Sequence, residues 1–437
     1  MNSRFKAALS TAVAAVMAFS MTACSDTGAK QEEASGEFTP KLDTEKDVTL
    51  DIAGFFGNFE ALDQVENDFN EYYPNVVFSY EQIGATNIDE YIANNSYTDI
   101  FMTSDDNVRF PGLSDKYVGN RCADLAAAGV DTSAFSDEML RTCYVDGKLL
   151  RVPMAQHIYG MAVNVTLLKK EGLSVPQNYS EFTAVLKTLK DKGYTPIQGP
   201  VNRVYSELIM NMADSIIGND KELQDALYSG DESAVQEIQP IFERLQDIVD
   251  NGWTDLAVNQ TYPDDNYDQA ILSFFEGDVP FWICDTEKVS GMKKRKSKSE
   301  AFSSSPFEYR FMFIPLGDNG FYEYREPWFG FSVNKDSEDF DYAAEFVRFL
   351  ATETEINKMA EIKGVPFATE TKAEGIYSIV SNPKNVQLSF INDGAIKPHI
   401  TSFLGSKAKA LGTGEISSAE EAAKQFVQEC STVSRED

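Results

Sequence analysis

Two histidines, His157 and His399, are the only imidazole groups in this 437-residue sequence. They exclude a histidine-rich metal site, and a Ser-His-Asp or Cys-His arrangement would have to use one of them. The sequence lacks G-x-S-x-G, G-x-x-x-x-G-K-[ST], G-x-G-x-x-G and H-E-x-x-H motifs. Asp105-Asp106 and Asp264-Asp265 are pairs of the kind that a glycosidase uses, but 69 acidic residues make such pairs common by chance. Catalysis is therefore not indicated, and neither a cofactor nor a metal is expected.

The first part of the chain alternates between predicted strands and a helix. Residues 48–53 (VTLDIA) are β-branched and alternate in polarity, which predicts a strand, and 76–80 and 99–102 are further strands. Residues 60–73 carry apolar positions at helical spacing, and Pro74 ends that helix. This order is typical of a parallel α/β layer.

Ligands of parallel sheets bind beyond the carboxyl ends of the strands. This rule places Phe55, Phe56 and Asn58, which follow the first strand, at one rim with Asp105 and Asp106, which follow another. We expect one of the two phenylalanines to face the site and the other to face the core. The two aspartates either contact a ligand or cap the next turn.

The remaining chain supplies more helices and strands. Helices are predicted over 181–192 with Ser180 as the cap, within 211–250 with breaks near Gly218 and Gly230, over 269–275, around 340–350, and after a Ser418–Glu421 capping box. Strands are predicted over 279–284, 311–315 and 329–333. About 390 residues after the N-terminal region exceed one ordinary core, so two lobes are expected.

The N-terminal residues predict export and a lipid anchor. Arg4 and Lys6 precede an uncharged apolar run over 7–19, which is too short to span a bilayer but fits a secretory signal over residues 1–23. Met21-Thr22-Ala23-Cys24 resembles a bacterial lipobox, which implies a diacylated Cys24; the alternative is an ordinary cleaved signal. Residues 24–45 are then the lipidated cysteine and a flexible tether.

The net charge limits the classes of partner, and the cysteines and one basic run leave alternatives open. The net charge of −31 argues against nucleic acid and is compatible with a neutral or cationic ligand. Cys122 and Cys143 either pair or are single buried thiols. The basic run 293–298 is either a solvated surface or a docking or headgroup contact.

Three stretches in order resemble the extracellular sugar-binding proteins of ABC importers, the broad maltodextrin-binding class. The first runs from Asp146-Gly147-Lys148 to Asn164 and on to Gly193-Tyr194-Thr195-Pro196-Ile197. The second is Phe274-Phe275-Glu276-Gly277 through Ile283, and the third is Gly330 to Ser337 followed by the Ala-rich helix that ends at Leu350 and by Gly364-Val365-Pro366. The chain departs from the family pattern at Cys284–Glu287, where a Gly-x-Trp platform is common.

The resemblance implies an α/β, two-lobe, periplasmic-binding-protein-like (Venus flytrap) fold of class II type with hinge crossovers. It implies a first lobe from 46–155 and 332–385 and a second lobe from 156–331 and 386–437. A monomer that works with ABC permease subunits is expected, bound to the membrane through Cys24, with a carbohydrate between the lobes and no catalytic activity.

The resemblance also implies ligand contacts. These are His157 and Tyr159 on one crossover, Trp328 at another, Asn202, Arg203 and Tyr205 on the second lobe, and Asp285 and Glu287 in place of the missing tryptophan. Sugar rings need flat apolar surfaces together with paired hydrogen-bonding groups. The alternatives are core packing for Trp328 and a structural hydrogen bond for His157. A surface-anchored glycan-binding adhesin and a glycan-acting enzyme remain the alternative functions.

Overall fold

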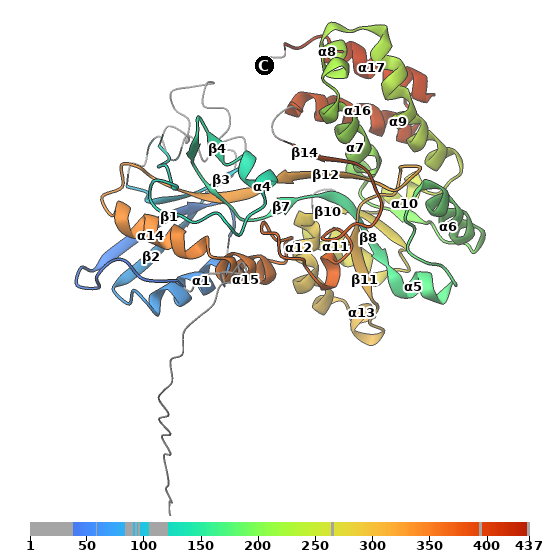
Figure 1. Ribbon diagram of the computed structural model, residues 1–437. Coiled ribbons are helices and arrows are strands. Elements are labelled where there is room, and N and C mark those ends of the chain that lie inside the picture. The colour runs from blue at the N-terminus through green and yellow to red at the C-terminus, as the bar shows by residue number, and fades with distance from the viewer. Residues whose placement is uncertain are drawn as a thin grey trace, which may run out of the picture. The chain divides into compact units, whose positions relative to one another are not determined.

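The computed structural model describes residues 38–57, 59–83, 91, 94, 97–104, 121–263, 266–392 and 396–434. Helices and strands alternate through most of this part of the chain, as the sequence predicts, so the α/β class is confirmed. Figure 1 shows the elements. In the part of the chain that is described, no helix is long and apolar enough to cross a membrane.

The first lobe is built on a mixed sheet with the strand order β2-β1-β3-β13-β6. β1 pairs in parallel with β2 and β3, whereas β13 runs antiparallel to β3 and β6. The strands are β1 (Val48–Gly54), β2 (Val76–Gln82), β3 (Ile100–Ser104), β6 (Val152–Pro153) and β13 (Phe329–Val333), with a hairpin of β4 (Tyr144–Val145) and β5 (Lys148–Leu149). The helices are α1 (Glu60–Asn70), α4 (Asp137–Arg141), α14 (Phe340–Leu350) and α15 (Glu353–Lys363).

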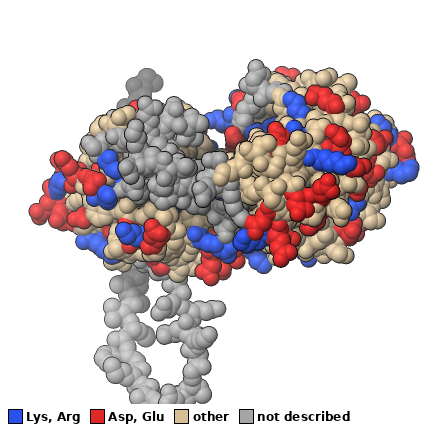
Figure 2. Space-filling view, turned by 90° about the horizontal axis from the view of Figure 1, so that it is seen from above, with Lys and Arg blue, Asp and Glu red and all other residues tan. Residues whose placement is uncertain are grey.

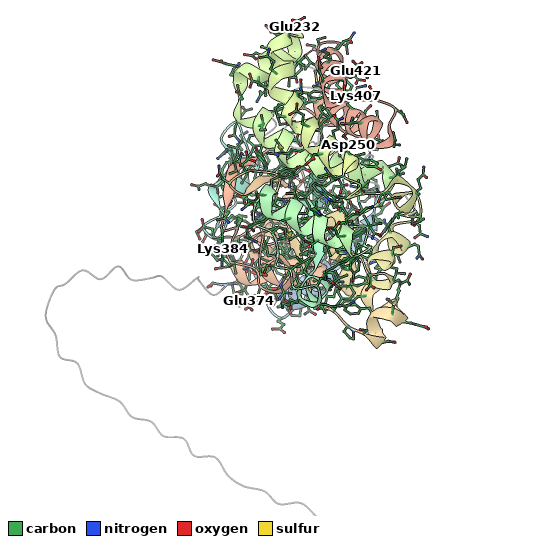
Figure 3. The ribbon with its side chains drawn as sticks, turned by 90° about the vertical axis from the view of Figure 1, so that its right-hand side faces the viewer. Glu232, Asp250, Glu374, Lys384, Lys407 and Glu421 are labelled. Atoms are coloured by element: carbon green, nitrogen blue, oxygen red, sulfur yellow. The ribbon has the colours of Figure 1, made fainter. Side chains whose placement is uncertain are left out.

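The second lobe contains a sheet with the order β11-β8-β10-β9. Its strands are β8 (Tyr159–Asn164), β9 (Ile197–Gln198), β10 (Phe281–Asp285) and β11 (Tyr309–Met312). Its helices are α5 (Val165–Lys170), α6 (Tyr179–Asp191), α7 (Val201–Asn219), α8 (Lys221–Ser229), α9 (Glu232–Asp250), α10 (Leu256–Asn259), α11 (Tyr267–Glu276), α12 (Thr286–Arg295), α13 (Glu300–Ser304), α16 (Pro398–Thr413) and α17 (Ala419–Cys430). Glu232 and Asp250 mark the two ends of α9 in Figure 3.

Three chain segments pass between the two lobes, and we call them crossovers. The first (residues 154–158) contains β7 (Gln156–His157), and the second (residues 321–328) contains β12 (Phe321–Pro327), which leads directly into β13. The third (residues 366–380) follows α15. β7 pairs with β12, and β12 pairs on its other edge with β14 (Val386–Ile391), so a small sheet forms at the crossovers.

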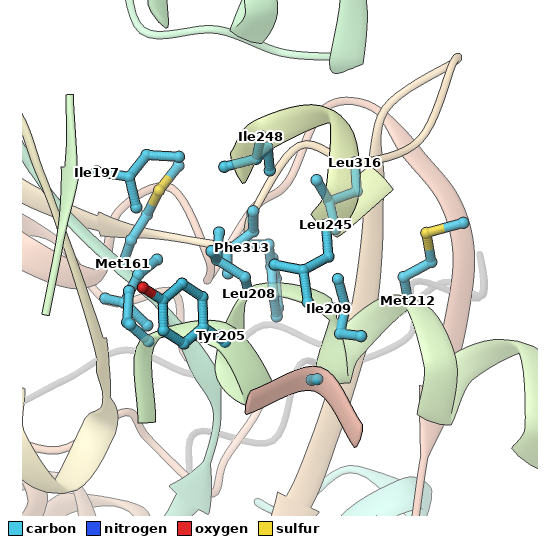
Figure 4. Close-up of a cluster of buried hydrophobic side chains, with 14 of the residues drawn as sticks. Met161, Ile197, Tyr205, Leu208, Ile209, Met212, Leu245, Ile248, Phe313 and Leu316 are labelled. Atoms are coloured by element: carbon cyan, nitrogen blue, oxygen red, sulfur yellow. The ribbon is translucent and has the colours of Figure 1, made fainter. Parts of the chain in front are cut away.

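The buried apolar residues form two main clusters, one for each lobe. Phe69, Met102 and Phe346 are fully buried around the first sheet, and the second cluster surrounds β8 and α7. Figure 4 shows Tyr205, Leu208 and Ile209 of α7 within the second cluster. Tyr377 and Val380 belong to the second cluster, whereas the sequence analysis assigned them to the first lobe. The exact lobe boundaries stay a prediction.

Several local predictions need correction. The cap of α6 is Asn178 rather than Ser180, because the Asn178 side chain accepts a hydrogen bond from the Glu181 amide. α7 begins at Val201, ten residues before the predicted start. The Ser418 cap is confirmed. Cys122, Cys143, Cys284 and Cys430 are all buried, and none of these four joins a disulfide.

Candidate functional site

A histidine held between two carboxylates lies where the first and second crossovers meet. His157 on β7 is directly opposite Glu326 on β12, and its Nδ1 lies 2.7 Å from Glu326 Oε1. Its Nε2 lies 3.8 Å from Asp285 Oδ2. Burial alone would lower the pKa of His157, but the two carboxylates outweigh it and raise this pKa to about 10. His157 is therefore a cation at neutral pH.

Asp285 is the fully buried anion of the site. It ends β10 and caps α12 by accepting a hydrogen bond from the Lys288 amide. Its Oδ2 lies 2.8 Å from Arg203 Nη2 and 3.4 Å from Lys288 Nζ. Burial opposes ionisation, yet His157, Lys288 and Arg203 hold the pKa of Asp285 well below its usual range.

Arg203 on α7 is the second cation of the site. Its Nε forms an ion pair with Glu207 one helical turn further on. Burial, together with the negative charge of Asp285, raises the pKa of Glu207 to about 7 although Arg203 opposes this change. The Arg203 side chain is 39% exposed, and its Nη1 takes part in neither of these two ion pairs. A guanidinium nitrogen of this kind can donate a hydrogen bond to a solute.

A row of aromatic rings runs beside these charges. Ring centroids are 5.9 Å apart for Phe56 and Trp328, 5.8 Å for Trp328 and His157, and 4.7 Å for His157 and Tyr159. Tyr159 in turn lies 6.5 Å from Tyr324 of β12. Trp328 and Tyr159 are only partly buried. The row therefore presents ring surface next to charged hydrogen-bonding groups, and it draws on both lobes.

Two further ionisable groups near this row, one buried and one partly buried, were not predicted. The carboxylate oxygens of Asp214 on α7 accept no hydrogen bond from the described residues, and burial together with the nearby Glu326 raises the Asp214 pKa well above its ordinary value. Lys363, at the end of α15, places Nζ 3.6 Å from the centroid of the Phe56 ring. Burial lowers the pKa of Lys363 to about 8.

The predicted site residues do not all meet. Phe56, His157, Tyr159, Asp285 and Trp328 come together. Phe55 is partly buried against core residues of the first lobe, Glu287 is 47% exposed, and Asn202 contacts Lys409. Tyr205 was predicted to contact the ligand, but it is only 1% exposed, because its ring packs against Gly412 of α16. Asn58, Asp105, Asp106 and Cys24 lie outside the described residues.

Sequence reasoning missed Glu207, Tyr324 and Lys363, and it did not count Glu326, which precedes Trp328, among the contacts. The period of two in residues 321–327 was a usable signal, since it places Tyr324 and Glu326 on one face of the strand.

Asp285 and Glu326 have lowered pKa values and are both ionised at neutral pH, whereas burial raises the pKa of Glu207 to about 7 and that of Asp214 well above its ordinary value. No group of three or more His, Cys, Asp or Glu residues within the described ranges is arranged to hold a metal ion. Two α/β lobes joined by crossovers, with an aromatic and charged site at the crossovers, define a two-lobe solute-binding protein of the periplasmic type.

The chain belongs to the bacterial extracellular solute-binding protein family, whose model matches residues 57–355. Comparison with curated proteins found no match. Three solved structures illustrate the shared fold. They are a sugar transporter from Bacillus licheniformis in complex with stachyose (18% identity, 88% of this chain and 99% of that chain, TM-score 0.61), a family 1 extracellular solute-binding protein from Bifidobacterium longum subsp. infantis (17%, 89% and 100%, 0.63) and the sugar-binding protein MalE from Xanthomonas citri (15%, 88% and 96%, 0.66).

Proposed function

We propose that this protein captures a carbohydrate between its lobes and delivers it to an ABC importer. The observation that carries the proposal is the aromatic row Phe56–Trp328–His157–Tyr159, flanked by the partly exposed side chain of Arg203. Pyranose rings stack their C–H faces on aromatic rings, and guanidinium and carboxylate groups take paired hydroxyls. The sugar ligands in the names of structural neighbours support the same class.

The site spans elements of both lobes, which suits closure around a ligand. Phe56 precedes α1 in the first lobe, whereas Arg203 and Asp285 belong to the second. A ligand that contacts both sides stabilises the closed arrangement by its differential affinity for that arrangement. The permease subunits are then the partners that distinguish the closed from the open protein. We also propose that the protein acts as a monomer whose two lobes are joined at the three crossovers.

Thermal shift and calorimetry against a panel of neutral and amino oligosaccharides test the ligand class. At least one glycan is expected to raise Tm, and Trp328→Ala is expected to weaken its binding by about 1–3 kcal/mol, which is about 5-fold to 150-fold. Tyr144→Ala is the matched control, because the Tyr144 ring is 39% exposed on the β4–β5 hairpin. If another solute class raises Tm and no glycan does, the carbohydrate proposal fails; new reducing ends would indicate an enzyme instead.

We also propose that Cys24 carries the lipid that holds the protein at the outer face of the cell membrane, with residues 24–45 as a tether. The support is the lipobox-like Met21-Thr22-Ala23-Cys24 after the apolar run. Detergent phase partitioning tests this: the native chain is expected in the detergent phase and Cys24→Ser in the aqueous phase. Equal partitioning of both would contradict the anchor.

A further inference from the structure

One guanidinium contacts all three crossovers. Arg325, on the second crossover, donates from Nη1 to Gln156 Oε1 at 2.7 Å on the first and from Nη2 to the Val380 carbonyl on the third. Its Nε donates to Glu323 at 2.7 Å on its own strand. The Arg325 side chain is only 12% exposed, so this network is largely shielded from water. Hydrogen bonds that involve a charged group and are shielded from water are stronger than hydrogen bonds at an open surface.

Gln156 extends the network. Its Oε1 accepts from Arg325, and its Nε2 donates to the Phe367 carbonyl at 2.9 Å on the third crossover. Phe367 also forms a β-bridge with Ala155. The first and third crossovers are therefore joined by a backbone bridge and by a side-chain hydrogen bond at neighbouring residues. Arg325 adds hydrogen bonds from the second crossover to both of them.

The residues of this network alternate with residues of the candidate binding site. Gln156 and His157 are neighbours on β7, and Arg325 and Glu326 are neighbours on β12. Because successive side chains of a strand point to opposite faces, the Arg325–Gln156 pair lies on one face of the crossover sheet and the Glu326–His157 pair on the other. A shift of β7 against β12 must disturb both pairs together.

A cavity of about 650 Å³ borders the network on its own face. It is lined by Gln156, Arg325, Phe367, Met139 of α4 and Phe390 of β14, among others. Close-packed side chains would fix the spacing of the crossovers by contact alone. Where this cavity interrupts the packing, the hydrogen bonds of Arg325 and Gln156 act together with the backbone pairing of β7 and β12 to hold that spacing.

We propose that Arg325 and Gln156 form an interlobe clamp that sets the resting angle between the lobes and positions His157 and Glu326 for the ligand. Both are positioning residues, since their contacts lie on the face away from the aromatic row. The clamp changes the population of the binding-competent arrangement. Only its effect on ligand affinity rests on the proposed carbohydrate function; its effect on the ligand-free protein does not.

Distances between spin labels in the full chain test the clamp without any ligand. Labels at Glu71→Cys and Glu237→Cys report one exposed position on each lobe, in a Cys24→Ser background. The native Cys122, Cys143, Cys284 and Cys430 are buried and should not react. Arg325→Met and Gln156→Leu are expected to broaden the distance distribution and shift its mean. Arg325→Lys, which keeps the charge but loses the fork, should fall between these variants and the native protein.

Arg244→Met is the matched control. Arg244 also pairs with a carboxylate, Asp318 at 2.7 Å, and stacks on an aromatic ring, Tyr179 at 3.8 Å, but all three residues lie within the second lobe. It should lower stability without changing the interlobe distances. Where a glycan ligand is found, Arg325→Met should also weaken its binding about tenfold, because the competent arrangement becomes a minor population.

The outcomes separate the clamp from a merely structural role. If Arg325→Met and Gln156→Leu lower Tm but leave the native distance distribution, the clamp is refuted. If Arg325→Met does not fold, Gln156→Leu decides alone, because it keeps the guanidinium and its Glu323 pair. A failure of every glycan to bind leaves the distance measurement intact and counts against the proposed function only.

Discussion

Replacing His157 by glutamine should destabilise the protein strongly and in a pH-dependent way. The imidazolium is the only described cation in contact with Glu326, and it also faces the buried Asp285. Glutamine retains a hydrogen-bond donor for Glu326 but carries no charge. His157→Gln therefore removes the electrostatic interaction while it preserves most of the volume.

The size of the effect follows from the pKa of His157. Its rise from the ordinary value of 6.5 to about 10 corresponds to about 5 kcal/mol, at about 1.4 kcal/mol for each pH unit. Because glutamine keeps one hydrogen bond, and Asp285 keeps Arg203 and Lys288, we expect a loss of about 3–5 kcal/mol in the free energy of unfolding, the usual range for breaking a buried ion pair.

The sign of the pH dependence is fixed by the direction of this pKa change. A group whose pKa is raised in the folded state stabilises fully below its unfolded pKa and loses that stabilisation as pH rises through the folded value. The stability difference between the native protein and His157→Gln should be largest below pH 6.5, decline above it and vanish near pH 10. Urea unfolding at a series of pH values, followed by circular dichroism, measures this difference.

His399→Gln is the control, since the His399 imidazole lies 3.4 Å from the Tyr228 hydroxyl. It should cost less than about 1 kcal/mol, as for an ordinary neutral hydrogen bond. A His157→Gln difference that is constant between pH 6 and pH 10 would refute the charged state assigned to His157, whatever its size.

Two further predictions concern α7 and α16. Asp214→Asn should raise the free energy of unfolding by about 1–3 kcal/mol at pH 7, because a buried carboxylate that accepts no hydrogen bond from the described residues and has a raised pKa costs stability as pH rises above 3.8. This stabilisation should disappear below pH 3.8. Urea unfolding at pH 7 and below pH 3.8 measures the difference. Gly412→Ala should cost about 1–3 kcal/mol, because its new methyl group would lie 2.3 Å from the Tyr205 ring. Gly405→Ala on the same helix meets Ser206 at an ordinary 3.4 Å and should gain up to about 1 kcal/mol; equal Tm changes for the two glycines would contradict the α7–α16 packing.

Local patterns in the sequence predicted the first strands and helices well. Residues 48–53 alternate because one face of β1 is buried, and the apolar positions Leu62, Val65 and Phe69 repeat because α1 buries one stripe. These patterns are short-range consequences of burial, and they can be recognised without knowledge of the tertiary structure. The α6 cap was also legible, since Asn178 and Glu181 have capping-box spacing, but Ser180 offered a competing cap two residues later.

The site was predicted only in part, because its central contacts join distant residues. His157 and Glu326 are 169 positions apart in the sequence, and no local sequence pattern indicates that they pair. The start of α7 was missed, and with it the helical placement of Arg203 and Tyr205, which turned out to face opposite environments. Charge pairing and helix rotation depend on the assembled lobes, so sequence alone could name candidates but not their partners.

The neighbourhood of Trp328 also gives the protein a built-in optical signal. Trp253 and Trp282, the other two tryptophans, are buried in the second lobe, whereas Trp328 is half-buried and its ring lies 5.8 Å from the charged His157. Protonated imidazole quenches indole emission at short range. Fluorescence of Trp328 should therefore brighten as His157 loses its proton near pH 10, and a ligand that separates or shields the two rings should change the emission at neutral pH without any added label.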